Sequence, residues 1–179
     1  MKPLEGKTAF VTGAAQRKGN GISNLMMEKG ACVIMTDKSG IVKESEKKLE
    51  EMTGQQGSIS YIMDVTQADS VEEVVKDAES RVGSIDILVN NAGISLLTEI
   101  KDMDDGLWDL HFDVNVNGAR NCVKAILPGM MERRYGRIIT ISSVTGPRVC
   151  DPANIAYATT KAALLGFSKA IAIDTAEYN

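Results

Sequence analysis

Five short apolar runs alternate with longer amphipathic segments along this chain of 179 residues, and this alternation limits the possible folds more than any other feature. The amphipathic segments carry apolar residues at helical spacing and end in glycine stop signals, such as Gly30 after Lys29 and Gly83 two residues after Arg81. Strands that alternate with helices require a parallel sheet with right-handed crossovers and helices on both faces. The sequence therefore predicts an α/β fold with a doubly wound parallel sheet. The expected strands are Thr8–Thr12, Cys32–Thr36, Ser58–Met63, Ile85–Val89 and Gly136–Ile141.

Polar or glycine-rich motifs follow the carboxyl ends of these runs. In an open parallel sheet those ends meet at one edge, and ligands bind in the crevice outside them. We therefore expect the motifs to line one ligand site. They are the turn from Gly13 to Gly21, the carboxylates Asp37 and Asp64, the segment Asn90–Gly93, and the serines Ser142 and Ser143.

The first of these motifs is a glycine-rich turn between a strand and a helix, running from Gly13 through Arg17 to Gly19 and Gly21. Such a turn places backbone N–H groups and a helix N-terminus where a diphosphate can sit. The next strand ends in Asp37. In dinucleotide-binding folds, a carboxylate about 20 residues after the glycine-rich turn binds the ribose hydroxyls, and Asp37 lies close to that spacing. Together these features predict a dinucleotide cofactor.

The second chemically informative feature is the pair Tyr157 and Lys161, at the start of an expected helix. Four residues apart, the two side chains share one helix face, with Cβ atoms roughly 5–6 Å apart. An ammonium beside a phenol stabilises the phenolate, which makes the tyrosine able to exchange a proton near neutral pH. Alone, such a pair is equally consistent with an exposed tyrosine and a solvated lysine. The strand-end motifs favour a proton-transfer site for a carbonyl or an alcohol.

Composition excludes several other classes of function. The net charge of −4 and the pI of about 5.1 give no support to a nucleic-acid partner or an anionic membrane surface. Cys32, Cys122 and Cys150 are too widely spaced for a zinc site or a disulfide framework, and no metal centre is expected. We find neither a signal peptide nor a membrane-spanning stretch, so the expected location is the cytoplasm.

Taken in order, the motifs resemble those of the short-chain dehydrogenase/reductase family, from about Lys7 to Tyr178. Within that family, Ser142–Gly146 and Ala156–Ala158 are similar to a group of bacterial oxidoreductases. The resemblance implies a single NAD(P)-binding Rossmann domain over residues 1–179. The motifs that carry it are Thr12-Gly13 with Gly19, Asp37, Asp64-Val65, Asn90-Asn91-Ala92-Gly93, Asn115, Ser143, and Tyr157 with Lys161.

The resemblance also implies a catalytic group. Tyr157 would be the general acid/base, and Lys161 would assist it and bind the nicotinamide ribose. Ser143 would orient the substrate carbonyl, and it is preferred to Ser142 because its spacing to Tyr157 fits the family better. Asn115 would hold a water that links Lys161 to solvent, whereas the nearby Asn117 is expected to face elsewhere.

The expected cofactor contacts follow from the same resemblance. Asp64 would meet the adenine, and Asn90 and Gly93 would lie behind the nicotinamide. The full set of cofactor-binding residues that we expect is Gly13, Arg17, Gly19, Asp37, Asp64, Val65, Asn90, Asn91, Ala92, Gly93, Tyr157 and Lys161.

Arg17 departs from the family pattern, which has a second glycine at this position. Its side chain could obstruct the approach of the cofactor. Alternatively, its guanidinium could join Lys18 and Lys38 in binding a 2′-phosphate. Asp37 would repel that phosphate and accept ribose hydroxyls instead. The expected cofactor is therefore NAD(H), with NADP(H) as the alternative.

A second departure is that the sequence stops at Asn179, soon after Lys161. Family members continue with further strands and a substrate loop, so the domain is expected to be incomplete at its C-terminus and to lack the last strands. The run Gly136–Ile141 would then form an exposed sheet edge. The chain is expected to be a fragment or truncated product.

The sequence thus predicts an oxidoreductase that transfers a hydride between a nicotinamide cofactor and a small-molecule secondary alcohol or ketone. The alternative is a catalytically inactive remnant that binds a dinucleotide or serves as an assembly module. By analogy with the family, a homodimer or homotetramer is expected, built on the helical regions near 105–134 and 155–177.

Overall fold

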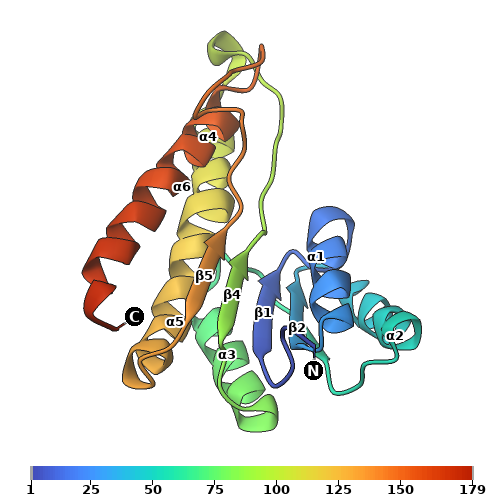
Figure 1. Cartoon of the computed structure of the whole chain (residues 1–179). Coiled ribbons are helices and arrows are strands. Elements are labelled where there is room, and N and C mark those ends of the chain that lie inside the picture. Colours follow the sequence, from blue (N-terminus) through green and yellow to red (C-terminus); the bar gives the residue numbers. More distant parts are fainter. Residues whose placement is uncertain (1, 179) are drawn as a thin grey trace.

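The computed structural model, which describes residues 2–178, contains one five-stranded sheet in the order β3-β2-β1-β4-β5 (Figure 1). Every neighbouring pair of strands is parallel. The chain builds outward from β1 to β3, then crosses back to place β4 on the other side of β1. The strand order reverses between β1 and β4, which is where doubly wound sheets bind ligands. The strands are β1 (Thr8–Thr12), β2 (Cys32–Asp37), β3 (Ile59–Ile62), β4 (Ile87–Asn90) and β5 (Arg137–Thr140).

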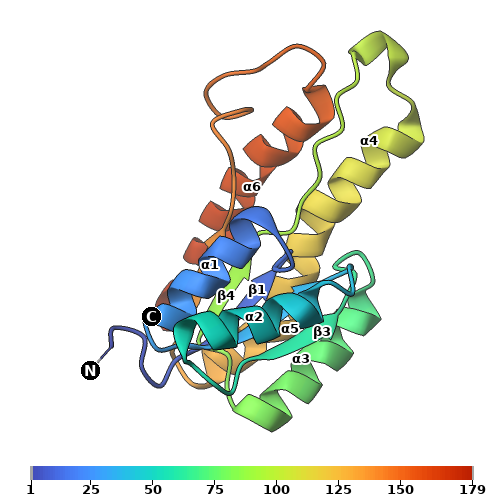
Figure 2. The ribbon, with the colours of Figure 1, turned by 90° about the vertical axis from the view of Figure 1, so that its right-hand side faces the viewer.

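Helices cover both faces of the sheet (Figures 1 and 2). Helices α1 and α2 lie on one face, and α3, α5 and α6 lie on the other (Figure 1). A short helix, α4, packs against α6 beyond the carboxyl ends of the strands. The α-helices are α1 (Arg17–Glu28), α2 (Val42–Thr53), α3 (Ala68–Val82), α4 (Asp105–Phe112), α5 (Gly118–Glu132) and α6 (Ile155–Asp174). The remaining helical turns are η1 (Ile100–Asp102), η2 (Asp113–Asn117) and η3 (Ala176–Tyr178).

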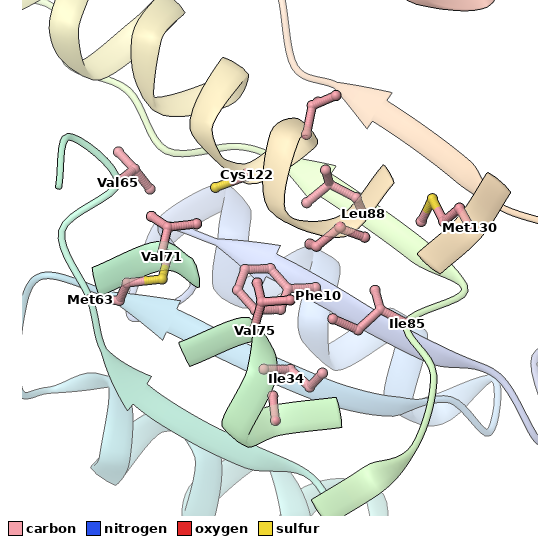
Figure 3. Close-up of a cluster of buried hydrophobic side chains, with 13 residues drawn as sticks. Phe10, Ile34, Met63, Val65, Val71, Val75, Ile85, Leu88, Cys122 and Met130 are labelled. Atoms are coloured by element: carbon pink, nitrogen blue, oxygen red, sulfur yellow. The ribbon is translucent and has the colours of Figure 1, made fainter. Parts of the chain in front are cut away.

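The strands bury side chains on both faces because both faces are covered. Phe10 and Leu88 point into the cluster beneath α3 and α5, which Figure 3 shows with Val75 and Met130. Val11, the next residue of β1, points into the second cluster beneath α1 and α2. A side chain as fully buried as that of Phe10 contributes about 1.5–3 kcal/mol relative to its exposed state. This double core holds the carboxyl ends of the strands in a fixed arrangement.

The predicted doubly wound parallel sheet is confirmed, with all five expected strands at their expected places. One element differs from the sequence interpretation. The apolar periodicity predicts a single helix over about 105–134, whereas the structure has α4, a π-helical turn η2, and then α5. A π turn adds one residue per turn and rotates the side chains after it. In this chain it turns Asn115 inward, where it is 1% exposed.

Strand β5 lies at the edge of the sheet, as the sequence predicts, and pairs with β4 alone. Ile139 of β5 is 43% exposed. A groove of about 340 Å³ runs beside this edge between α5 and α6 and is lined in part by Met130, Ile138 and Ile171. Over residues 2–178, none of the helices combines the length and the apolar character needed to cross a membrane.

Candidate active site

A cleft of about 720 Å³ opens at the carboxyl ends of the strands. Three chain segments far apart in the sequence meet in it: the glycine-rich turn after β1, the loop after β4, and the first turns of α6. Of the expected site residues, the cleft is lined by Gly13, Arg17, Gly19, Asp37, Asp64, Val65, Asn91, Ala92, Gly93, Tyr157 and Lys161. The strand-end motifs therefore lie together, as predicted from their places in the sequence.

The glycine-rich turn is fixed to the end of β4 by two side chains. Asn91 donates from Nδ2 to the carbonyl oxygens of Thr12 (2.9 Å) and Gly13 (3.1 Å). The hydroxyl of Thr12 accepts the backbone N–H groups of Asn91 and Ala92, both at 3.0 Å. A Cβ at Gly19 would fall far inside van der Waals contact with the Gly13 carbonyl oxygen, so this position requires glycine. The result is a closely packed turn at the start of α1.

Arg17 occupies a backbone conformation that suits glycine. Its φ is +51°, in the left-handed region, and it is the first residue of α1. A non-glycine residue held there stores of order 1–3 kcal/mol of strain. Arg17 and Lys18 are exposed and line the cleft, where Lys38 adds a third cation beside Asp37. The mouth of the cleft therefore carries more positive than negative side chains.

The two carboxylates after β2 and β3 are oriented by backbone amides. Asp37 accepts the N–H of Ala15 at Oδ2 (3.1 Å) and the N–H of Ser39 at Oδ1 (2.9 Å). Asp64 accepts the N–H of Thr66 at 2.9 Å. Because each carboxylate caps a turn at the cleft, its position is set before any ligand arrives.

Tyr157 and Lys161 lie in the first two turns of α6, with the Lys161 ammonium 5.7 Å from the centroid of the Tyr157 ring. Tyr157 is partly exposed to the cleft, whereas Lys161 is 5% exposed and donates to the carbonyl oxygen of Ile141 at 2.7 Å. Burial, and then the charge of Lys18, lowers the pKa of Lys161 from 10.5 to about 8. The sequence prediction that these two side chains share one face of a helix at the cleft agrees with this geometry.

The depressed pKa of Lys161 predicts a pH-dependent stability. Between pH 8 and 10.5 the unfolded chain holds the proton on this lysine while the folded chain has released it, so this group makes stability rise with pH. Below pH 8 both states hold the proton, so the folded chain bears the full cost of burying the charged ammonium of Lys161. We expect Lys161→Met to stabilise the unliganded chain relative to the native sequence at pH 7, and this advantage should shrink as pH rises from 8 to 10. Urea unfolding at a series of pH values measures it.

Lys169→Met is the matched control for that prediction, because Lys169 is exposed on the same helix. Its effect on stability should be small, because the side chain it replaces is exposed. A Lys161→Met advantage that stayed constant up to pH 10 would contradict the depressed pKa.

Asn115 connects three elements around the cleft. Its Oδ1 accepts the N–H of Ile94 (2.7 Å), and its Nδ2 donates to the carbonyl oxygen of Ile94 (3.0 Å) and to Oγ1 of Thr160 (2.9 Å). A Cβ at Gly93 would lie 3.1 Å from Asn115 Oδ1 and 3.6 Å from Lys161 Nζ, so these groups converge. Asn117 is exposed and bonds Asp113 instead. Asn115 thus holds the loop beside the cleft without lining the cleft itself, and Asn117 points elsewhere. The expected water-holding role of Asn115 stays a prediction.

The two serines after β5 have different environments. Ser142 lines the cleft, and its hydroxyl donates to the carbonyl oxygen of Lys161 at 2.8 Å. The hydroxyl of Ser143 accepts the N–H of Thr145 at 3.1 Å, which leaves its own O–H available to donate. Ser143 is not among the residues that line the cleft. The preference for Ser143 as the carbonyl-orienting serine therefore stays a prediction.

Asn90, like Asn115 and Ser143, is an expected site residue that does not line the cleft. It ends β4, is 5% exposed, and its side-chain amide makes no hydrogen bond within residues 2–178. Its neighbour Asn91 makes the contacts to the glycine-rich turn described above. A place for Asn90 behind the cofactor remains a prediction.

Sequence reasoning missed the loop that follows Gly93. Ile94 and Leu96 line the cleft together with Leu110 of α4. Thr160, which bonds Asn115, was also missed. The available signal was the apolar character of the residues directly after the Asn90–Gly93 motif. No cluster of three or more His, Cys, Asp or Glu side chains that could hold a metal ion occurs in the part of the chain that the structure describes.

Comparisons with known proteins agree with this geometry. The family model described as "short chain dehydrogenase" matches residues 7–179. Oxidoreductase UcpA of Escherichia coli K12 is 43% identical over 178 residues, which cover 99% of this chain and 66% of the relative. The 3-oxoacyl-[acyl-carrier-protein] reductase FabG of Vibrio harveyi is 38% identical and is covered to 69%. The expected similarity to bacterial oxidoreductases of the UcpA type is confirmed.

Solved structures show the same fold. The crystal structure of NAD+-bound xylitol dehydrogenase has a TM-score of 0.94 and 30% identity, covering 99% of this chain and 68% of that one. A short-chain dehydrogenase/reductase structure from Burkholderia xenovorans has a TM-score of 0.93 and 32% identity, with 70% of that chain covered. The chain thus spans about two thirds of the length of the proteins it matches.

Proposed function

The chain belongs to the short-chain dehydrogenase family, and we propose that its site serves proton and hydride transfer between a nicotinamide dinucleotide and a small secondary alcohol or ketone. The observation that carries the proposal is the Tyr157–Lys161 pair on one face of α6, in the same cleft as the glycine-rich turn. Bound in that cleft, the cofactor would supply the hydride. The proton would come from the chain itself.

The residues of the cleft fit a dinucleotide. Gly13 and Gly19 allow the turn before α1 to pack closely, because a Cβ at either position would press on Asn91 or on the chain's own backbone. Such a turn at a helix start would present backbone N–H groups to a diphosphate. Asp37 and Asp64, both oriented by backbone amides, would hold the adenosine end. Lys161, which lies close to Gly93 in the same cleft, would bind the second ribose. These contacts are proposed from the family pattern.

Tyr157 would deliver the proton to the substrate oxygen when a ketone is reduced and take it up when an alcohol is oxidised. The ammonium of Lys161 lies 5.7 Å from the centroid of the Tyr157 ring, one helical turn further along α6. Ser143 would donate a hydrogen bond to the same oxygen through its available O–H. Asn115 connects the loop after β4 to α6 through hydrogen bonds to Ile94 and Thr160. These bonds help to fix the position of Lys161, the residue after Thr160. Together these groups would supply the general acid/base chemistry.

The test of this proposal is turnover, followed by absorbance at 340 nm, with a panel of secondary alcohols and ketones and both cofactor types. The expected result is cofactor-dependent turnover with at least one member of the panel. Nucleotide binding without turnover across the panel would contradict it and favour the inactive remnant.

For the cofactor, we propose NAD(H). The carboxylate of Asp37 lies at the end of β2 in the cleft, where it would accept ribose hydroxyls and repel a 2′-phosphate. Three cations that line the same cleft would favour NADP(H) instead, because they would attract a 2′-phosphate: Arg17, Lys18 and Lys38. Paired fluorescence titrations with NADH and NADPH decide between them: tighter binding of NADPH would overturn the choice of NAD(H).

Replacing Arg17 by glycine is expected to stabilise the unliganded chain by up to about 1 kcal/mol, because it relieves the left-handed backbone at this residue. Arg17→Ala is the matched control, since it removes the guanidinium but keeps a Cβ at the same φ. Thermal unfolding should show a gain for the glycine variant alone. Equal stability of the two variants would contradict the strain at Arg17.

The same two variants report on the role of the guanidinium in binding. If Arg17 obstructs the cleft, both variants should bind NADH and NADPH more tightly than the native chain. If its charge contacts a phosphate, both should bind more weakly, and the loss should diminish at high salt.

We also propose a cytoplasmic homodimer or homotetramer. The three cysteines are free thiols, which agrees with a reducing compartment. Light scattering after size exclusion measures the assembly state, and a monomer at micromolar concentration would contradict this part of the proposal.

A further inference from the structure

His111, on α4, is completely buried, and both of its ring nitrogens have a partner. Nδ1 lies 2.8 Å from the carbonyl oxygen of Leu107, and Nε2 lies 3.1 Å from the backbone nitrogen of Leu96. A carbonyl can only accept and a backbone N–H can only donate. His111 is therefore a neutral imidazole with its proton on Nδ1 and an accepting Nε2. Its second partner, Leu96, lies in the loop that lines the cleft.

That loop runs from the end of β4 to η1 and is held at every second residue. Asn115 binds both backbone groups of Ile94, His111 binds the N–H of Leu96, and the carbonyl oxygen of Ala153 accepts the N–H of Thr98 at 2.7 Å. Of the three residues held in this way, Leu96 is the one that lines the cleft with an exposed apolar side chain, and His111 is the side chain that holds it.

The side chains on either side of this contact form an apolar wall. Leu96 of the loop and Leu110, which precedes His111 on α4, both line the cleft that contains Tyr157. Leu96 is 47% exposed and Leu110 is 43% exposed. Leucines half exposed in a cleft are available to contact a ligand, and their positions are set by the backbone that carries them.

We propose that His111 is a positioning residue for the substrate: by accepting the N–H of Leu96, it fixes the apolar wall that Leu96 and Leu110 present to the carbon side of an alcohol or ketone. This inference rests on the proposed function for its substrate role. The hydrogen-bond geometry on which it depends can be tested without turnover.

Two substitutions separate the two contacts of the imidazole. In His111→Gln the side-chain oxygen can reach the place of Nε2 and accept the Leu96 N–H. In His111→Asn the shorter amide can replace Nδ1 at Leu107 but does not extend to Leu96. Both variants bury an amide at the same position, so a general loss of packing affects both.

The Asn variant is expected to raise the KM for substrates with an apolar substituent roughly tenfold, with a smaller change in kcat. The Gln variant should stay within about threefold of the native KM. The affinity for NADH should remain unchanged in both, because the cofactor-binding start of the loop, Asn91–Gly93, is held by Asn91 and Asn115 and not by His111. Equal KM values for the two variants, or a parallel loss of cofactor affinity, would overturn the positioning role.

The hydrogen-bond geometry gives an independent readout. His111 is the only histidine of the chain, so 15N labelling of histidine in the full chain gives a single pair of ring signals. A protonated Nδ1 and an unprotonated Nε2 are expected at pH 7, with slow hydrogen exchange at the Leu96 amide. His111→Asn should speed that exchange at least tenfold, whereas Thr98 should be unaffected. A proton on Nε2, or unchanged exchange in the Asn variant, refutes the inference.

The experiments distinguish a failure of the proposed function from a failure of the inference about His111. The expected ring signals without turnover would refute the proposed function and, with it, the substrate role of His111. Turnover with equal KM values in the Gln and Asn variants would refute only the inference about His111.

Discussion

Replacing Tyr157 by phenylalanine is expected to reduce kcat by about 10²–10⁴-fold, the usual contribution of a general acid/base. The substitution removes one hydroxyl and leaves the ring in the first turn of α6, beside the ammonium of Lys161. Affinity for NADH should stay within about threefold, since the glycine-rich turn and the strand-end carboxylates are unchanged. Steady-state kinetics on the best substrate of the panel, with a fluorescence titration of NADH, measures both effects.

Tyr135→Phe is the matched control for this prediction. Tyr135 lies near the start of β5, where the ammonium of Lys7 packs over its ring at 3.9 Å, and its hydroxyl makes no side-chain hydrogen bond within residues 2–178. This variant should keep full activity. A Tyr157→Phe protein with more than about a tenth of the native kcat would contradict the role assigned to Tyr157.

Replacing Gly19 by alanine is the second change with a large expected effect. The new Cβ would overlap the carbonyl oxygen of Gly13 and crowd the side-chain amide of Asn91, so the turn must open. We expect a loss of about 1–3 kcal/mol of stability from the forced shift. Binding of NADH should weaken about 100-fold or more, because two or more backbone N–H groups that would meet the diphosphate move away. Urea unfolding and fluorescence titration give the two values.

Gly21→Ala provides the comparison, two residues further along the same helix. A Cβ at Gly21 would meet nothing within 4 Å, and the residue is exposed. Alanine is the better helix former by about 1 kcal/mol, so this variant should be slightly stabilised and bind NADH normally. If both alanine variants weakened NADH binding alike, the turn at Gly19 would not be the cofactor site.

The sheet and the cleft could be predicted because their signals are local. Thr8–Thr12 followed by Gly13 reads as a strand and a tight turn without knowledge of any distant residue. Once the strands are known, the parallel order of the sheet brings Asp37 and Asp64 to the same edge as that turn. The pair Tyr157 and Lys161 likewise needs only helical spacing to share a face.

The rest of the site depends on contacts that no local pattern encodes. The π turn at Asp113–Asn117 is too short to alter the apolar periodicity, yet it turns Asn115 inward. The loop after Gly93 is shaped by hydrogen bonds to Asn115 and His111, which come from helices later in the chain. Whether Ser142 or Ser143 faces the substrate depends on one backbone turn after β5. Such details follow from tertiary packing and not from propensity.

The central claim is that the cleft holding Tyr157 and Lys161 serves proton and hydride transfer to a carbonyl. Its most direct test is to supply NADH deuterated at the transferable position with a panel of ketones and to analyse the products by mass spectrometry. We expect one deuterium on the alcohol carbon with the native chain and with Tyr135→Phe, and labelling reduced at least about 100-fold with Tyr157→Phe. A chain that binds NADH and yet leaves every ketone unlabelled would contradict it.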